Sequence, residues 1–189
     1  MEAFLTSTVL VGVAEIGDKT QLLSFVLSAR LRRPWPILSG ILCATLLNHA
    51  LAAWAGALIA QWLPPFALAW LVGLSFIAFG LWALRPDTQS DAPTLQGAGA
   101  FSTAFVAFFL VEMGDKTQLA TVALAARFDA LMAVVVGTTL GMIIANAPAV
   151  WLGEHLAHKI PMRSVRILAS ILFVALGSLT LLSGALSHG

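Results

Sequence analysis

The sequence is poor in charge and in cysteine. Only 10% of its 189 residues are Asp, Glu, Lys or Arg, whereas about a quarter of a typical soluble domain is charged. So few charges cannot cover the surface of a globule, which excludes a soluble enzyme and a disordered regulator. The formal net charge of +1 offers no basic excess for phosphates, which excludes a nucleic-acid partner. The single cysteine, Cys43, excludes an intramolecular disulfide and a cysteine metal cluster.

Apolar residues dominate what remains. They make up 59% of the chain, and the mean hydropathy is +0.93, so we expect an integral membrane protein in contact with the lipid bilayer. A spanning helix needs ~20 mostly apolar residues. Six runs approach or exceed that length: 4–29, 35–62, 66–84, 101–126, 131–153 and 165–183. We therefore predict an all-α fold of six transmembrane helices. The first run carries charges in its middle, unlike a cleaved signal peptide, so we expect it to persist as a helix.

The two halves of the chain repeat each other. Residues 15–21 read EIGDKTQ and residues 112–118 read EMGDKTQ, and the same offset of 97 aligns Phe4 with Phe101 without a gap. Each half holds three runs, and an odd number makes the second half enter the membrane from the opposite side. Two inverted three-helix repeats are the plan of many secondary transporters. We predict a first repeat over 1–84, a connector over 85–100 and a second repeat over 101–189.

Loop charges predict the orientation. Loops on one side carry seven basic residues: Arg30, Arg32, Arg33, Arg85, Lys159, Arg163 and Arg166. The other side carries only Arg127. Basic loops stay in the cytoplasm, so the rich side is predicted to be cytoplasmic and both termini to lie outside the cytoplasm.

Six charged residues interrupt the apolar runs: Glu15, Asp18, Lys19, Glu112, Asp115 and Lys116. Each ionised side chain at mid-membrane costs ~2.5–3.5 kcal/mol on insertion scales, so such groups pair, face a cavity or bind an ion. Within each motif a glutamate and a lysine stand at i,i+4, the spacing of an intrahelical ion pair. Those pairs would leave both aspartates without an obvious partner. The six groups sum to −2, which a divalent cation would neutralise.

Helical spacing predicts where these side chains converge. On a continuous helix Glu15, Asp18 and Gln21 share one arc, and the second motif repeats the arrangement with Glu112, Asp115 and Gln118. Gly17 and Gly114 allow either close helix approach or local unwinding. The two motifs would then bring four carboxylates and two amide oxygens together near the midplane. Thr20 and Thr117 are expected on the opposite side, either bonded to a carbonyl one turn earlier or lining the ion path.

Other polar residues lie within the predicted second and fifth helices. Asn146 is a candidate ligand, or alternatively an interhelical hydrogen-bonding residue. His49 is its repeat equivalent and a candidate for the ion path. Pro148 frees a carbonyl one turn earlier, near Ile144, which could line a cavity. Asn48 is out of register and is predicted to make a packing contact.

Oxygen donors without thiolates favour hard cations such as Mg²⁺, Ca²⁺ and Mn²⁺. The doubled E-x-G-D-[KR]-[ST] motif resembles that of the Gdt family of Mn²⁺/Ca²⁺ transporters, within the lysine-exporter and cation/calcium-exchanger superfamily. The resemblance covers nearly the whole chain, and the short connector is similar to that of bacterial members implicated in manganese export.

The resemblance implies a function and a set of roles. It implies a secondary transporter of the bacterial inner membrane, without a cofactor or enzymatic activity, that exports Mn²⁺ by alternating access in exchange for H⁺. By motif match the cation ligands would be Glu15, Asp18, Glu112 and Asp115, followed by Gln21 and Gln118. Lys19 and Lys116 would pair with carboxylates in the empty state.

Other functions share these features. A Ca²⁺/H⁺ antiporter would use the same ligands, as would a divalent-cation channel, although conduction requires weaker binding. An ion sensor would bind without flux. An intramembrane enzyme could use paired carboxylates as acid and base, but the near-identity of the two motifs argues against the asymmetry that this chemistry needs.

Overall fold

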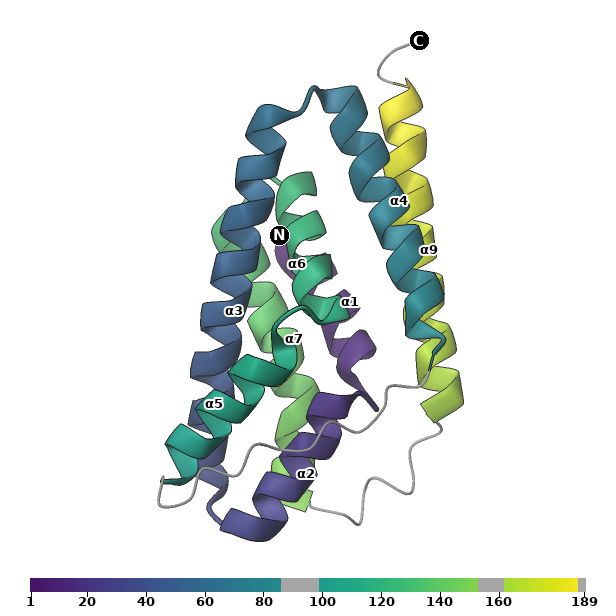
Figure 1. The fold of residues 1–189 in the computed structure, drawn as a ribbon. Coiled ribbons are helices and arrows are strands. Elements are labelled where there is room, and N and C mark those ends of the chain that lie inside the picture. The colour runs from purple at the N-terminus through teal and green to yellow at the C-terminus, as the bar shows by residue number, and fades with distance from the viewer. Residues whose placement is uncertain (86–98, 153–161, 187–189) are drawn as a thin grey trace.

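The computed structural model describes residues 1–85, 99–152 and 162–186 (Figure 1). Most of the predicted connector, and Lys159, lie outside these ranges. The described chain is all helical: α1 (Glu2–Glu15), α2 (Lys19–Leu31), α3 (Pro34–Trp62), α4 (Pro65–Ala83), α5 (Ala100–Glu112), α6 (Lys116–Arg127), α7 (Leu131–Leu152) and α9 (Met162–Leu186).

Four of the described helices are long and apolar enough to cross a bilayer. The candidate spans are Pro34–Trp62, Pro65–Ala83, Leu131–Trp151 and Arg163–Ala185, and they coincide with four of the six predicted runs. Many large apolar side chains on these helices are exposed, among them Leu74, Leu81, Ile171 and Leu179, as expected where lipid replaces water. The chain is an all-α, multi-pass membrane protein.

The other two predicted helices, 4–29 and 101–126, are not continuous. In the first, α1 ends at Glu15 and α2 begins at Lys19; in the second, α5 ends at Glu112 and α6 begins at Lys116. Gly17 and Gly114 adopt φ values of +83° and +80°, which belong to the left-handed region that only glycine enters at little cost. The predicted continuous arcs are therefore wrong, and local unwinding at the glycines is the alternative that occurs.

Equivalent contacts join the two halves. A Cβ atom placed on Gly40 of α3 would lie 2.6 Å from the Phe101 carbonyl oxygen at the start of α5. A Cβ on Gly137 of α7 would lie 2.6 Å from the Phe4 carbonyl oxygen at the start of α1. Both glycines and both phenylalanines are related by the offset of 97. Each half thus packs against the other through the same small residue.

The broken helices lie within the bundle. Helix α1 packs along α7, and α3 packs against both α5 and α6. Helices α4 and α9 run side by side as a pair at one edge of the molecule (Figure 1). The repeat equivalents Phe76 and Phe173 meet in that pair, with ring centroids 6.3 Å apart. The two helix breaks therefore face each other inside a frame of longer helices.

Candidate metal site

Each helix break is held by the motif's own side chains. Asp18 is the N-cap of α2, and its Oδ1 accepts a hydrogen bond from the Lys19 backbone amide at 2.7 Å. In the same motif Gln21 Oε1 accepts from the Gly17 amide at 2.9 Å. Backbone groups freed inside a membrane need partners, and the Gly-Asp-Lys-Thr-Gln order supplies them locally.

The second motif repeats this construction. Asp115 is the N-cap of α6 and accepts from the Thr117 amide at 3.4 Å, and Gln118 Oε1 accepts from the Gly114 amide at 2.7 Å. Both glutamine oxygens therefore bond to backbone. Gln21 also donates its Nε2 hydrogen to the Ala145 carbonyl of α7 at 2.9 Å. The acceptor is the carbonyl next to that of Ile144, which Pro148 was expected to free.

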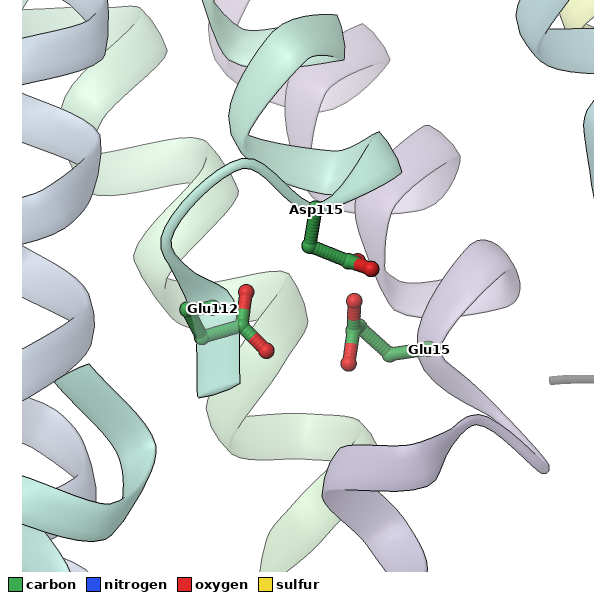
Figure 2. Close-up of side chains that lie close together, drawn as sticks. All are labelled: Glu15, Glu112 and Asp115. Atoms are coloured by element: carbon green, nitrogen blue, oxygen red, sulfur yellow. The ribbon is translucent and has the colours of Figure 1, made fainter. Parts of the chain in front are cut away.

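Three carboxylates meet between the breaks. One oxygen each from Glu15, Glu112 and Asp115 lies within 4.8 Å of the others (Figure 2). The two glutamates are fully buried, and Asp115 is 4% exposed. Oxygen atoms this close, with their charges removed from water, repel one another unless a cation or protons intervene. We call Glu15, Glu112 and Asp115 the carboxylate triad.

In each glutamate of the triad, one carboxylate oxygen accepts a hydrogen bond and the other has no partner among the described residues. Glu15 Oε2 accepts a hydrogen bond from the Thr20 hydroxyl at 2.5 Å, and Glu112 Oε2 accepts one from the Thr117 hydroxyl at 3.1 Å. The Oε1 atoms of both glutamates are buried and have no hydrogen-bond partner within the part of the chain that the structure describes. Unpaired buried carboxylate oxygens are the ligands that a hard cation takes.

Thr20 and Thr117 lie on the side of the carboxylates, contrary to the prediction. Thr20 and Thr117 were predicted to face away from the carboxylates, because a continuous helix would place them there. Unwinding at Gly17 and Gly114 turns α2 and α6 relative to α1 and α5, and each hydroxyl instead reaches back to the glutamate of its own motif.

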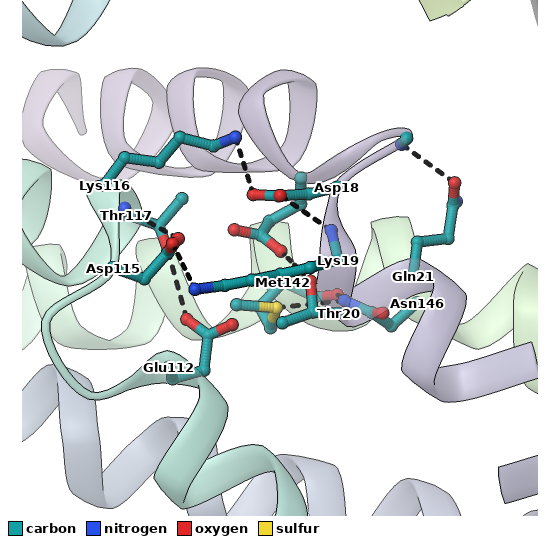
Figure 3. A network of polar contacts seen from close by, with 12 residues as sticks. Asp18, Lys19, Thr20, Gln21, Glu112, Asp115, Lys116, Thr117, Met142 and Asn146 are labelled. Carbon is teal, nitrogen blue, oxygen red and sulfur yellow. Dashed lines mark hydrogen bonds and ion pairs between the residues drawn. The ribbon is translucent and has the colours of Figure 1, made fainter. Parts of the chain in front are cut away.

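Both lysines pair with carboxylates, but with those of the opposite motif. Lys19 Nζ lies 2.7 Å from Asp115 Oδ1, and Lys116 Nζ lies 2.8 Å from Asp18 Oδ2 (Figure 3). The structure shows neither of the intrahelical glutamate–lysine pairs, because the break separates the two members onto different helices. The aspartates that seemed to lack partners therefore bind the lysines of the opposite motif. This exchange depends on tertiary structure and has no signal in local spacing.

The remaining predicted residues lie on α7 and α3. Asn146 is buried in α7, where its Nδ2 donates to the Met142 carbonyl at 3.0 Å and its Oδ1 accepts from Ser24 at 2.8 Å. His49 is fully buried in α3, and neither ring nitrogen has a hydrogen-bond partner among the described residues. Asn48 donates to the Phe109 carbonyl of α5 at 3.1 Å, which confirms the predicted packing contact.

Sequence reasoning missed Ser24. Its hydroxyl connects α2 to Asn146 of α7. The repeat offset contains a signal for it, since Thr121 is its equivalent and also bears a hydroxyl. A hydroxyl at the same position of both halves, within an apolar run, is the pattern that indicates a shared role.

One crevice beside the site is small. A crevice of about 10 Å³ beside Asp18 and Lys116 is bounded by Gly17, Ala83 of α4 and Arg166 of α9. A single water needs at least that volume, so a hydrated divalent ion cannot enter through this crevice without movement of the surrounding helices.

Comparison with known proteins identifies relatives of the chain. The family model described as "Divalent cation/proton antiporter GDT1" matches residues 3–91 and, a second time, residues 100–188. A Vibrio cholerae protein named "Putative manganese exporter" is 45% identical over 181 residues, which cover 95% of this chain and 90% of that protein. A GDT1-like protein of Synechocystis is 29% identical over 92% of this chain and 93% of its own length. GDT1-like protein 5 of Arabidopsis thaliana is 27% identical over 97% and 96%. No solved structure matches the chain.

Proposed function

Because the chain belongs to the GDT1 family of divalent cation/proton antiporters, we propose that it exports Mn²⁺ from the cytoplasm in exchange for H⁺. The family consists of cation transporters, so the chain is not an enzyme, and the ions are its substrates rather than cofactors. The single observation that carries the proposal is the carboxylate triad with two unpaired glutamate oxygens.

The triad supplies the direct ligands in this proposal. Glu15, Glu112 and Asp115 offer oxygens to one point, and Thr20 and Thr117 fix the glutamate carboxylates. Of the other predicted ligands, Asp18, Gln21 and Gln118 brace the two breaks, and Asn146 accepts a hydrogen bond from Ser24 of α2. His49 stands beside the path as a polar group buried in α3.

The proposed topology is two inverted three-span repeats. Counting α1 with α2 and α5 with α6 as one span each gives six crossings, with repeats over 1–84 and 101–189 and a connector over 85–100. Support comes from the double match of the family model and from the reciprocal contacts of Gly40 and Gly137. We place the protein in the bacterial inner membrane with both termini outside the cytoplasm.

Alternating access follows from this plan. With the crevice beside Asp18 too small for a hydrated ion, movement of one repeat against the other opens the triad first to the cytoplasm and then to the outside. Mn²⁺ leaves on the outer side, and protons occupy carboxylates for the return. The relative whose printed name describes a manganese exporter supports Mn²⁺ as the substrate. Ca²⁺ is the second candidate, because every donor in the triad is oxygen.

Transport by purified protein in liposomes tests the proposal. Mn²⁺ flux is measured under an imposed pH gradient and, separately, a Na⁺ gradient, with Ca²⁺ and Mg²⁺ as competitors. We expect saturable Mn²⁺ flux that depends on the pH gradient. Flux that neither saturates nor responds to the gradient would indicate a channel, and binding without any flux would indicate a sensor; either result would overturn the proposal.

A further inference from the structure

The two lysines of the motifs serve a purpose that the ligand set alone does not explain. Each crosses to the aspartate of the opposite motif, at 2.7 Å for Lys19 and Asp115 and 2.8 Å for Lys116 and Asp18. The Lys19 side chain is 19% exposed, whereas that of Lys116 is 5% exposed. Both positive charges are therefore held, largely out of water, beside the carboxylate triad.

These lysines set the formal charge of the two motifs. Four carboxylates and two ammonium groups leave a formal charge of −2 in the motifs. In a buried setting, any charge that remains after an ion binds carries a large desolvation cost. A divalent cation brings the total to zero, whereas a monovalent cation leaves −1 and a trivalent cation leaves +1.

We infer that Lys19 and Lys116 determine the charge selectivity of the site, by neutralising the two aspartates so that a divalent ion alone balances the remaining charge. The inference rests on the proposed cation-binding function and adds a role for residues that do not ligate the ion. A purely structural role would make the lysines matter for folding but not for the ratio of affinities between ions of different charge.

The two lysines differ in how their partners relate to the carboxylate triad. Asp18 contributes no oxygen to the triad and is held by Lys116, while Asp115 belongs to the triad and also binds Lys19. Lys116 and Asp18 therefore form a pair that alters the charge without altering the triad. They are the residues to vary, and Lys116, the less exposed of the two lysines, should have the larger effect on removal.

The test measures binding of Mn²⁺ and La³⁺ to the purified full chain. Free Mn²⁺ is followed by its electron paramagnetic resonance signal, and La³⁺ is added as the competitor. In Lys116→Met, which leaves −3, we expect the preference for La³⁺ over Mn²⁺ to rise at least about tenfold, because one extra unit of cation charge meets one uncompensated negative charge at an effective dielectric constant of about 20. In Asp18→Asn, which leaves −1, the preference should fall by a similar factor.

The double variant Lys116→Met with Asp18→Asn restores −2 and should return the preference to within about threefold of the unaltered protein. Lys116→Arg keeps the charge and should do the same, and the exposed Arg33→Gln controls for loss of a distant charge. An unchanged preference in both single variants would overturn this inference alone. Should Lys116→Met not fold, a preference in Asp18→Asn that fails to fall would overturn it. No Mn²⁺ binding by the unaltered protein would overturn both this inference and the proposed function.

Discussion

Lys19 Nζ lies 2.7 Å from Asp115 Oδ1, so the first motif is tied to the second by an ion pair that crosses between the two halves of the chain. The partner of Lys19 is 96 residues away in sequence and is the N-cap residue of α6, at the second helix break. The same relationship, reversed, joins Lys116 to Asp18 at 2.8 Å. The two breaks are thereby held against each other.

The first prediction concerns this ion pair. Lys19→Asp places a third acid beside Asp115 and Glu112, and Asp115→Lys places a second base beside Lys19, so each single change should destabilise the protein by about 3 kcal/mol, as expected when one member of a buried pair is lost. The charge swap that combines the two restores the ion pair but not the Asp115 cap, so its loss should be smaller than the sum of the two single losses. Thermal unfolding in detergent measures it, and additive losses in the swap would contradict the pairing.

The second prediction concerns the glycine of a break. Gly114 has φ of +80°, and a Cβ atom there would meet nothing within 4 Å, so any cost of Gly114→Ala is conformational. We expect a loss of roughly 1–2 kcal/mol and a marked fall in Mn²⁺ flux. Gly99→Ala is the matched control, because its Cβ also meets nothing and its φ of −66° suits alanine. Equal behaviour of the two variants would contradict the account of the break.

The third prediction concerns the contacts between repeats. Gly40→Ala and Gly137→Ala each force a Cβ to within 2.6 Å of a backbone carbonyl oxygen, so both should lower the free energy of unfolding by about 1–3 kcal/mol and by similar amounts. Gly12→Ala is the control, since its Cβ would lie at an ordinary 3.5 Å from Gly141. Thermal unfolding of the three variants measures these losses. Clearly unequal losses for Gly40→Ala and Gly137→Ala would contradict the equivalence of the two contacts.

The fourth prediction concerns the threonine that holds a ligand. Thr117→Val removes the hydroxyl that donates to Glu112 Oε2 at 3.1 Å and keeps the shape of the side chain. That hydrogen bond holds the carboxylate in its orientation, and loss of a group that orients a metal ligand typically weakens metal affinity by roughly 10–100-fold, so we expect Mn²⁺ binding to weaken by about tenfold or more. Thr117→Ser retains the hydroxyl and should bind within a few-fold of the unaltered protein. Equal Mn²⁺ affinities for the two variants would show that the hydroxyl has no such role.

Part of this arrangement could be predicted from the sequence. The apolar runs predicted the long helices α3, α4, α7 and α9, because hydropathy needs no tertiary information. The constant offset of 97 indicated that equivalent residues would meet, and Glu15 and Glu112 do so. The breaks at Gly17 and Gly114 were one of two alternatives, and the aspartate that follows each glycine and caps the next helix is the signal that could have decided between them.

The rest depended on tertiary structure. The rotation of about 100° per residue relates side chains only along a continuous helix. Thr20 and Thr117 lie beyond the breaks from Glu15 and Glu112, so their positions could not be predicted from spacing. The crossing of Lys19 and Lys116 to opposite aspartates requires both breaks to face each other. Local spacing could offer only the intrahelical pairs as an alternative, because it includes only neighbours along one helix.

The central claim is that Mn²⁺ and protons exchange through the carboxylate triad, and simultaneous recording of both ions in proteoliposomes tests it most directly. A trapped pH indicator reports protons while Mn²⁺ flux is measured, for the unaltered chain, for Glu112→Gln and for the exposed Glu2→Gln as a control. The account predicts opposed movement of the two ions in the unaltered chain and in Glu2→Gln, and loss of both movements in Glu112→Gln. Mn²⁺ flux that persists in Glu112→Gln, or that proceeds in the unaltered chain without proton movement, would contradict it.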